Sequence, residues 1–246
     1  MEGTCLRLAD AIFSSSACSA DCCAEHYGLD REKIPVLHTG VDTVHFSPRE
    51  TAAHGRPTII FVGRVSADKG AMHLLEASCR LVSQIPDLKL TLVGGGKSQF
   101  LKELQQRAIQ LSCPNLLDQA GFVSRDELPY YLSRATVFAL PSHHEPGPGL
   151  VYLEAMACGL PVIGCDNAGA AEVVRDGETG LLVPPKNVRA LETALQALLL
   201  DVQRRSSMAR RARQYVVEAF DSRQCIKKIE ALYSSVVSQA RVGCTR

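Results

Sequence analysis

The sequence lacks an excess of charge of either sign and lacks any long apolar run. Over 246 residues, 27 Lys and Arg residues balance 26 Asp and Glu residues, for a formal net charge of +1. Such a chain has no overall field to attract nucleic acid, so the composition predicts no nucleic-acid partner. No apolar run reaches the roughly 20 residues that span a bilayer. The sequence therefore predicts no transmembrane segment and leaves peripheral membrane contact open.

The N-terminus also lacks the layout of a secretory signal peptide. It has no basic start, and the apolar stretch within residues 1–16 is broken. The expected location is therefore cytoplasmic. The length allows one large domain, or one domain with appendages, and 46% hydrophobic residues can form a normal globular core.

The ten cysteines form no CxxC pair and no second cluster at the spacing of zinc ligands. Cys18, Cys22 and Cys23 lie close together but lack the remaining ligands of such a site. Others, including Cys79 and Cys113, fall in or beside helical patterns, where buried thiols behave as small hydrophobic side chains. We therefore interpret the cysteines as structural or incidental.

From Pro57 onward, strand-like and helix-like segments alternate, which predicts βαβ units and a parallel sheet. The strand-like segments are Thr58–Val62, Leu88–Val93, Thr136–Leu140, Pro161–Gly164 and Gly180–Val183, with a further short strand possible before Gly121. The helix-like segments are Ala71–Val82, Ser98–Leu111, Asp126–Arg134, Gly149–Cys158 and Val188–Leu200. The strands are apolar nearly throughout, as in a sheet covered on both faces. We expect an α/β domain with a doubly wound parallel sheet that binds its ligand at the carboxyl ends of the strands.

The two ends of the chain fit this alternation less well. Ala9–Phe13 and Ile34–His38 have strand patterns, and Ser15–Tyr27 has a helical pattern. The C-terminal part predicts one or two helices and contains the basic segment Arg204–Arg213. This segment is either a patch for nucleic acid or membrane, or the solvated face of a helix. We favour the solvated face, because apolar residues recur there at helical spacing and the net charge is near zero.

Between Glu145 and Asp166, the only charged residue is Glu154. It lies on a predicted helix that is apolar on nearly every side. Burying even a neutral polar group without a hydrogen bond costs roughly 2–7 kcal/mol, so we expect a polar partner for this carboxylate rather than a chance core position. Gly147 and Gly149 leave the backbone bare at the start of the helix, where N–H groups and the helix dipole favour anions. A carboxylate beside an anion site suits a nucleotide sugar.

Further candidates for binding phosphate follow the first strand. Gly63 lets the chain turn at the strand end, and Arg64 and Lys69 precede the helix that begins at Ala71. Arg can bind phosphate through two parallel hydrogen bonds, and Lys adds a point charge. Two cations at a helix start oppose its dipole unless an anion lies between them, which favours a phosphate site over two surface cations. We interpret Gly94–Lys97 as a tight connection that lines the same cleft.

Taken together, these segments resemble the C-terminal half of a retaining glycosyltransferase of family 4, which has the GT-B fold. The matching segments, in the family's order, are His38–Asp42, Phe61–Arg64 with Lys69 and Gly70, Leu92–Gly96, Gly121–Val123, Leu140–Ser142, Glu145–Pro161 and Glu172–Val183. The resemblance implies a Rossmann-like sheet that forms one half of a GT-B architecture, with extra C-terminal helices. Residues 1–50 would be a remnant of the N-terminal acceptor domain plus the interdomain linker. Residues 51–220 would bind the nucleotide sugar, and residues 221–246 would form a C-terminal helix and tail.

The resemblance also implies roles for the matched residues. Arg64 and Lys69 would hold the donor diphosphate during the reaction. Glu145 would bind the transferred sugar and help at the reacting carbon; the alternative is an ordinary loop acid. The backbone amides of Gly149 and Leu150 would contact the phosphate and the sugar.

Three more residues complete the implied donor site. Glu154 would accept hydrogen bonds from the ribose hydroxyls, the main chain near Val123 would touch the base, and Gly63 would line the site. No metal and no cofactor are implied, because cations and a helix dipole can carry the charge of the leaving group. The implied reaction is transfer of a hexose from a nucleotide sugar to an unknown acceptor, with retention of configuration.

The chain departs from the family pattern in ways that keep alternatives open. Eight residues, rather than seven, separate Glu145 from Glu154, and Thr39 stands where the family usually has Asn. The resemblance implies that most of the acceptor domain is missing from this chain, which would then be a truncated gene product, a fragment or a half-enzyme. The chain could therefore act with an acceptor-domain partner chain, or it could be an inactive nucleotide-sugar-binding remnant. A different GT-B enzyme, such as a nucleotide-sugar epimerase, is a third possibility. We also expect uncovered apolar surface on residues 1–50 and on the helix at 221–238, and hence self-association.

Overall fold

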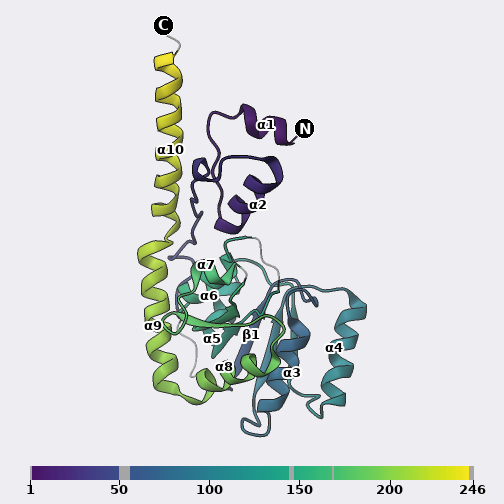
Figure 1. Cartoon of the computed structure of the whole chain (residues 1–246). Helices are drawn as coiled ribbons and strands as arrows, with labels where there is room; N and C mark the ends of the chain where they lie inside the picture. Colours follow the sequence, from purple (N-terminus) through teal and green to yellow (C-terminus); the bar gives the residue numbers. More distant parts are fainter. Residues whose placement is uncertain (1, 50–55, 144–146, 168, 244–246) are drawn as a thin grey trace.

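A parallel sheet of six strands, in the order β3-β2-β1-β4-β5-β6, organises the molecule (Figure 1). The computed structural model describes residues 2–49, 56–143, 147–167 and 169–243. The strands are β1 (Thr58–Val62), β2 (Lys89–Val93), β3 (Leu117–Gly121), β4 (Val137–Ala139), β5 (Val162–Cys165) and β6 (Gly180–Val183). The strand order reverses between β1 and β4, and ligands of open α/β sheets bind at such a switch point.

Helices cover both faces of the sheet. On one face α3 packs against α4 and α8, and on the other α6 packs against α5, α7 and α9. Their bounds are α3 (Ala71–Leu81), α4 (Ser98–Gln110), α5 (Leu128–Arg134), α6 (Leu150–Ala157), α7 (Ala170–Val173), α8 (Val188–Leu200) and α9 (Val202–Ala219). In β1, Ile59, Ile60 and Phe61 are at most 1% exposed. The predicted doubly wound, Rossmann-like α/β fold is confirmed.

The strand predictions need two corrections. The possible strand before Gly121 is present as β3, and it is only half-buried because it forms an edge of the sheet. The strands predicted at Ala9–Phe13 and Ile34–His38 are wrong. Only Val36 pairs there, in a single bridge with Ser14. These segments lie outside the six-stranded sheet, so no neighbouring strand extends the pairing.

A disulfide joins Cys79 on α3 to Cys113 in the loop after α4. No local sequence pattern pairs these two cysteines, because their contact depends on how α3 and α4 pack. Disulfides are uncommon in cytosolic proteins, so this one does not support the predicted cytoplasmic location, which stays a prediction. Among the described residues, no helix has the length and apolar character that a membrane crossing requires.

The basic segment lies on α9, whose apolar side packs on the domain while Arg204, Arg210 and Arg211 are exposed. Met208, Ala212 and Val216 are fully buried along one side of α9, which confirms the favoured interpretation. Three of its arginines donate to main-chain carbonyls. Arg205 Nη1 reaches the Leu198 and Leu199 oxygens at the end of α8, at 3.0 and 3.1 Å. Cations in this position also complement the dipole of α8.

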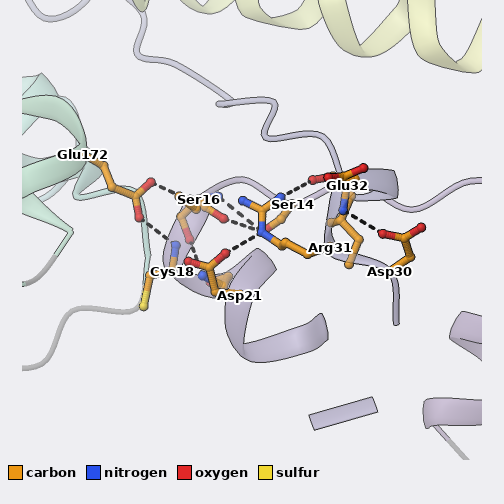
Figure 2. A network of polar contacts seen from close by, with 11 residues as sticks. Ser14, Ser16, Cys18, Asp21, Asp30, Arg31, Glu32 and Glu172 are labelled. Atoms are coloured by element: carbon orange, nitrogen blue, oxygen red, sulfur yellow. Dashed lines mark hydrogen bonds and ion pairs between the residues drawn. The ribbon is translucent and has the colours of Figure 1, made fainter. Parts of the chain in front are cut away.

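The N-terminal segment forms a small unit above the sheet. It contains α1 (Glu2–Leu8), α2 (Ala17–Tyr27) and the short 3-10 helix η1 (Arg31–Lys33), beside the long C-terminal helix α10 (Ser222–Gly243) (Figure 1). Figure 2 shows how Glu172 of α7 meets this unit: its carboxylate accepts hydrogen bonds from the backbone N–H groups of Ala17 and Cys18, at 2.8 and 3.0 Å. The unit has its own small core, which consists of Ala20, Ala24 and Ile34.

Candidate functional site

The loops that follow β1 and β4 touch at the switch point of the sheet. Gly70, the N-cap of α3, has a φ of +74°, and a Cβ atom there would lie 2.1 Å from the Pro141 carbonyl oxygen. The backbone N–H of His143 donates to the Asp68 carbonyl oxygen at 2.9 Å. Only a glycine at position 70 allows the start of α3 to lie so close to Pro141. These contacts place the loop that carries Arg64 and Lys69 beside the chain that leads to α6.

Arg64 lines a cavity of about 700 Å³ between the β1–α3 and β2–α4 loops. Its Nη2 atom lies 2.8 Å from Asp68 Oδ2, and hydrogen bonds from Ser66 and then Arg64 lower the pKa of that carboxyl. Gly95, Gly96 and Lys97 line the opposite side. The expectation that Gly94–Lys97 borders the same cleft as Arg64 is confirmed for these residues. Gly63 turns the chain at the end of β1, with a φ of +143°.

The start of α6 presents bare backbone, as expected. Gly149 is its N-cap, with a φ of +60°, and a Cβ atom there would lie 3.0 Å from the Gly169 carbonyl oxygen. No side chain of the described residues caps this helix, and its first turn holds no acid. Leu150, its first residue, is 42% exposed. Tyr152 is fully buried and donates its hydroxyl to the Leu140 carbonyl, so the first turn is anchored to the end of β4.

Glu154 has the polar partner that the sequence analysis requires. Its side chain is only 15% exposed, and Oε1 lies 3.7 Å from Arg125 Nη1. Burial raises the pKa of the Glu154 carboxyl, while the charges of Arg125 and His45 oppose that shift. At 3.7 Å this pair is an ion pair without a short hydrogen bond. The carboxylate therefore retains capacity to accept hydrogen bonds from a ligand.

Neither Arg125 nor His45 was predicted from the sequence to belong to this site. Arg125 lies in the loop after β3, and its guanidinium carbon is 5.2 Å from the centroid of the Phe46 ring. His45 Nε2 lies 3.0 Å from the Arg125 carbonyl oxygen, so it donates there when that nitrogen is protonated. One signal was available: Arg125 follows Val123 by two residues, in a loop at the ligand-binding edge. Val123 itself is half-buried in that loop.

The predicted site residues that the structure describes fall into two groups near the carboxyl ends of the strands. Gly63, Arg64 and Lys69 belong to the β1–α3 loop, whereas the other group consists of Val123, Gly149, Leu150 and Glu154. Lys69 is half-buried and does not line the cavity at Arg64. Glu145 lies outside the described residues. Within the described part of the chain, no cluster of three or more His, Cys, Asp or Glu side chains could hold a metal ion.

This strand order, with cations and an uncapped helix start at the switch point, defines a Rossmann-like domain suited to a phosphate-bearing ligand. Residues 45–215 match the family model of glycosyl transferases group 1. Because this match covers most of the chain, the chain belongs to that family.

Curated relatives match over long stretches of the sequence. The chain is 35% identical over 197 residues to the GDP-mannose-dependent alpha-(1-6)-phosphatidylinositol monomannoside mannosyltransferase of Mycolicibacterium smegmatis, which covers 74% of this chain and 51% of the relative. It is 32% identical over 261 residues to alpha-maltose-1-phosphate synthase of the same organism, covering 96% of this chain and 66% of the relative. The chain thus spans about half to two thirds of these proteins.

Solved structures share the fold. Sucrose-phosphate synthase from Thermosynechococcus elongatus superposes with a TM-score of 0.82 at 27% identity, over 97% of this chain and 61% of that one. The C-terminal domain of a glycosyl transferase group 1 family protein from Francisella tularensis gives a TM-score of 0.68 at 28% identity, over 74% of this chain and 98% of that one. Anabaena HepE in complex with UDP and glucose has the same fold, with a TM-score of 0.84 at 24% identity, over 94% of this chain and 65% of that one.

Proposed function

We propose that this chain supplies the donor-binding part of a retaining glycosyltransferase of family 4, which transfers a hexose from a nucleotide sugar to an acceptor. One observation carries the proposal: a cationic loop and an uncapped helix start follow the two strands at the switch point of the sheet, and a buried carboxylate lies on the same helix. The names of the relatives support it, since one depends on GDP-mannose and a structural neighbour was solved with UDP and glucose.

In this proposal each group meets a different part of the donor. Arg64 and Lys69 bind the diphosphate, where their charges stabilise the negative charge that develops on the leaving group. The amides of Gly149 and Leu150 contact the phosphate and sugar at the start of α6. Glu154 accepts hydrogen bonds from the ribose, and the loop that contains Val123 borders the base. Glu145 remains the predicted contact to the transferred sugar, and no metal is required.

The acceptor side requires surface beyond the donor domain. On α10, Ile226, Tyr233 and Val237 are 47%, 61% and 50% exposed, and they repeat at a spacing that places them on one side of the helix. We propose that an acceptor-domain partner, or a second copy of the chain, covers this side. The proposed site of action is the cytoplasm, with peripheral membrane contact left open.

The test is the thermal midpoint of the chain with UDP, GDP, ADP and their sugars. A ligand at about 100 times its dissociation constant stabilises by ~2.7 kcal/mol, or roughly 5–10 °C for a chain of this size. We expect a shift with one nucleotide family, lost in Lys69→Ala and kept in Lys102→Ala, which removes an exposed lysine from α4. If no nucleotide shifts a cooperative transition, the donor-site proposal is wrong.

A further inference from the structure

A second cavity lies at the opposite end of the strands from the proposed donor site. It has a volume of about 420 Å³, and its floor includes Ala135 and Leu160, which precede β4 and β5. The proposed donor loops follow the carboxyl ends of the strands, whereas this cavity opens at their amino ends. The two sites are therefore separate.

Three arginines line this cavity, and none of the described residues that line it is acidic. Arg213 has a structural role, because its Nη1 atom donates to the Ala157 carbonyl at the end of α6 and to the Phe46 carbonyl at 3.3 Å. The guanidinium groups of Arg49 and Arg210 form no hydrogen bond or ion pair with another described residue. Both side chains are exposed, so their two positive charges beside the cavity are open to an anion from solvent.

The thiol of Cys158 cannot supply that negative charge. It lies in the same cavity, and burial raises its pKa to about 12, although the charges of Arg213 and Arg49 act in the opposite direction. The thiol is therefore neutral at physiological pH.

We propose that this basic cavity binds a phosphorylated small molecule of about the size of a monosaccharide. Arg49 and Arg210 would bind the phosphate, because guanidinium groups form parallel hydrogen bonds to its oxygens. Ser133 Oγ accepts from the Arg49 backbone N–H at 3.0 Å, which leaves its hydroxyl proton for a ligand oxygen. The volume lies within the range of small-molecule pockets, and a bare phosphate ion would leave most of it empty.

Titration calorimetry of the full chain with glucose 6-phosphate tests the proposal. We expect saturable binding that weakens at least about tenfold in Arg49→Gln/Arg210→Gln, because each lost arginine removes charge-assisted hydrogen bonds. Arg204→Gln, which removes one positive charge at an exposed position of α9, should bind like the wild type. Lys69→Ala should also bind normally, which separates this cavity from the proposed donor site.

Further ligands identify the class of molecule. Inorganic phosphate should compete with glucose 6-phosphate but bind more weakly, and glucose should not compete. Absence of binding, or equal weakening in Arg204→Gln, would overturn the proposal. Loss of binding in Lys69→Ala alone would place the ligand in the donor site instead and would also overturn it. If Arg49→Gln/Arg210→Gln keeps its affinity for glucose 6-phosphate but loses affinity for an RNA oligonucleotide, the arginines serve nucleic acid and the proposal is wrong.

Discussion

At the scale of single residues, Glu154 combines a cost to stability with the proposed role in binding. Its carboxylate is largely buried and has one ion-pair partner, Arg125, at 3.7 Å. We expect Glu154→Gln to leave the free energy of unfolding unchanged or slightly higher, because the amide has a similar shape and carries no charge. The affinity for the nucleoside diphosphate should fall roughly tenfold, since a charge-assisted hydrogen bond is lost. Chemical unfolding and titration calorimetry measure the two effects.

The pH dependence of Glu154→Gln gives a second readout. Burial raises the folded pKa of the carboxyl above its usual value of 4.5, so the folded state holds the proton more tightly than the unfolded state. The stabilisation that follows is present at pH below 4.5 and is lost as the pH rises through the folded pKa. The variant should lack this loss. If the free energy of unfolding has the same pH profile in both proteins between pH 4 and 7, burial does not raise the pKa of Glu154 in the folded protein.

For His143 we expect stability to change with pH in the opposite direction, falling as the pH is lowered. Its Nε2 and the Nδ1 of His73 are buried without a hydrogen-bond partner among the described residues, and the ring centroids are 4.9 Å apart. Burial, then His73 and Lys186, lower the pKa of His143, while Asp68 raises it. The folded state therefore disfavours the proton, and stability should fall as the pH drops below the usual value of 6.5.

Urea unfolding at pH 7.5 and 5.5 measures this effect. We expect His143→Gln to lose less stability on acidification than the wild type. His26→Gln, at an exposed position of α2, should behave like the wild type. An equal acid-induced loss in all three proteins would assign the effect to other groups.

At the scale of elements, the contact between the β1–α3 and β4–α6 loops depends on Gly70. Alanine there would adopt a positive φ at a cost of roughly 1–2 kcal/mol, and its Cβ would overlap the Pro141 carbonyl, which adds roughly 1–3 kcal/mol. We expect Gly70→Ala to lower the free energy of unfolding by both amounts and to weaken nucleotide binding. Gly177→Ala is the matched control, because Gly177 has the same φ of +74° and no atom within 4 Å of a Cβ.

Gly177→Ala separates the cost of the positive φ from the cost of the close contact with Pro141. It should cost only the roughly 1–2 kcal/mol of the left-handed backbone and leave nucleotide binding unchanged. If the two variants are equally destabilised, the close approach of Gly70 to Pro141 adds nothing to stability.

The sequence predicted the elements well wherever the local pattern sufficed. The apolar runs Thr58–Val62 and Gly180–Val183 are strands over the predicted residues, and the helix at Val188–Leu200 has the predicted bounds. The sheet edge β3 was predicted only as a possible strand, because an edge strand need not be apolar. The Glu154–Arg125 pair and the disulfide could not be predicted, since they join residues whose proximity arises only from packing.

At the scale of the whole molecule, the N-terminal unit contacts the domain through polar groups from distant parts of the sequence. Glu172 accepts from two N–H groups in the first turn of α2, where Ser16 also accepts from the Ser19 N–H (Figure 2). Val41 accepts a backbone hydrogen bond from Ser222, the first residue of α10, and donates one to Phe220 just before that helix, each at 2.9 Å. These contacts set the position of α2 on the domain without a large shared apolar core.

Glu172→Ala should therefore loosen α2 while leaving the domain folded. Loss of a cap costs roughly 0.5–2 kcal/mol, so amide hydrogen exchange in α2 should speed up by a factor of about 2–30, whereas exchange in β1 should not change. Glu178→Ala, an exposed acid between α7 and β6, should leave α2 unchanged. Ser16→Ala removes the cap that lies within the N-terminal unit and should speed exchange in α2 by a similar factor. If Ser16→Ala has this effect and Glu172→Ala has none, α2 depends on its own cap, and the contact with the domain contributes nothing to its stability.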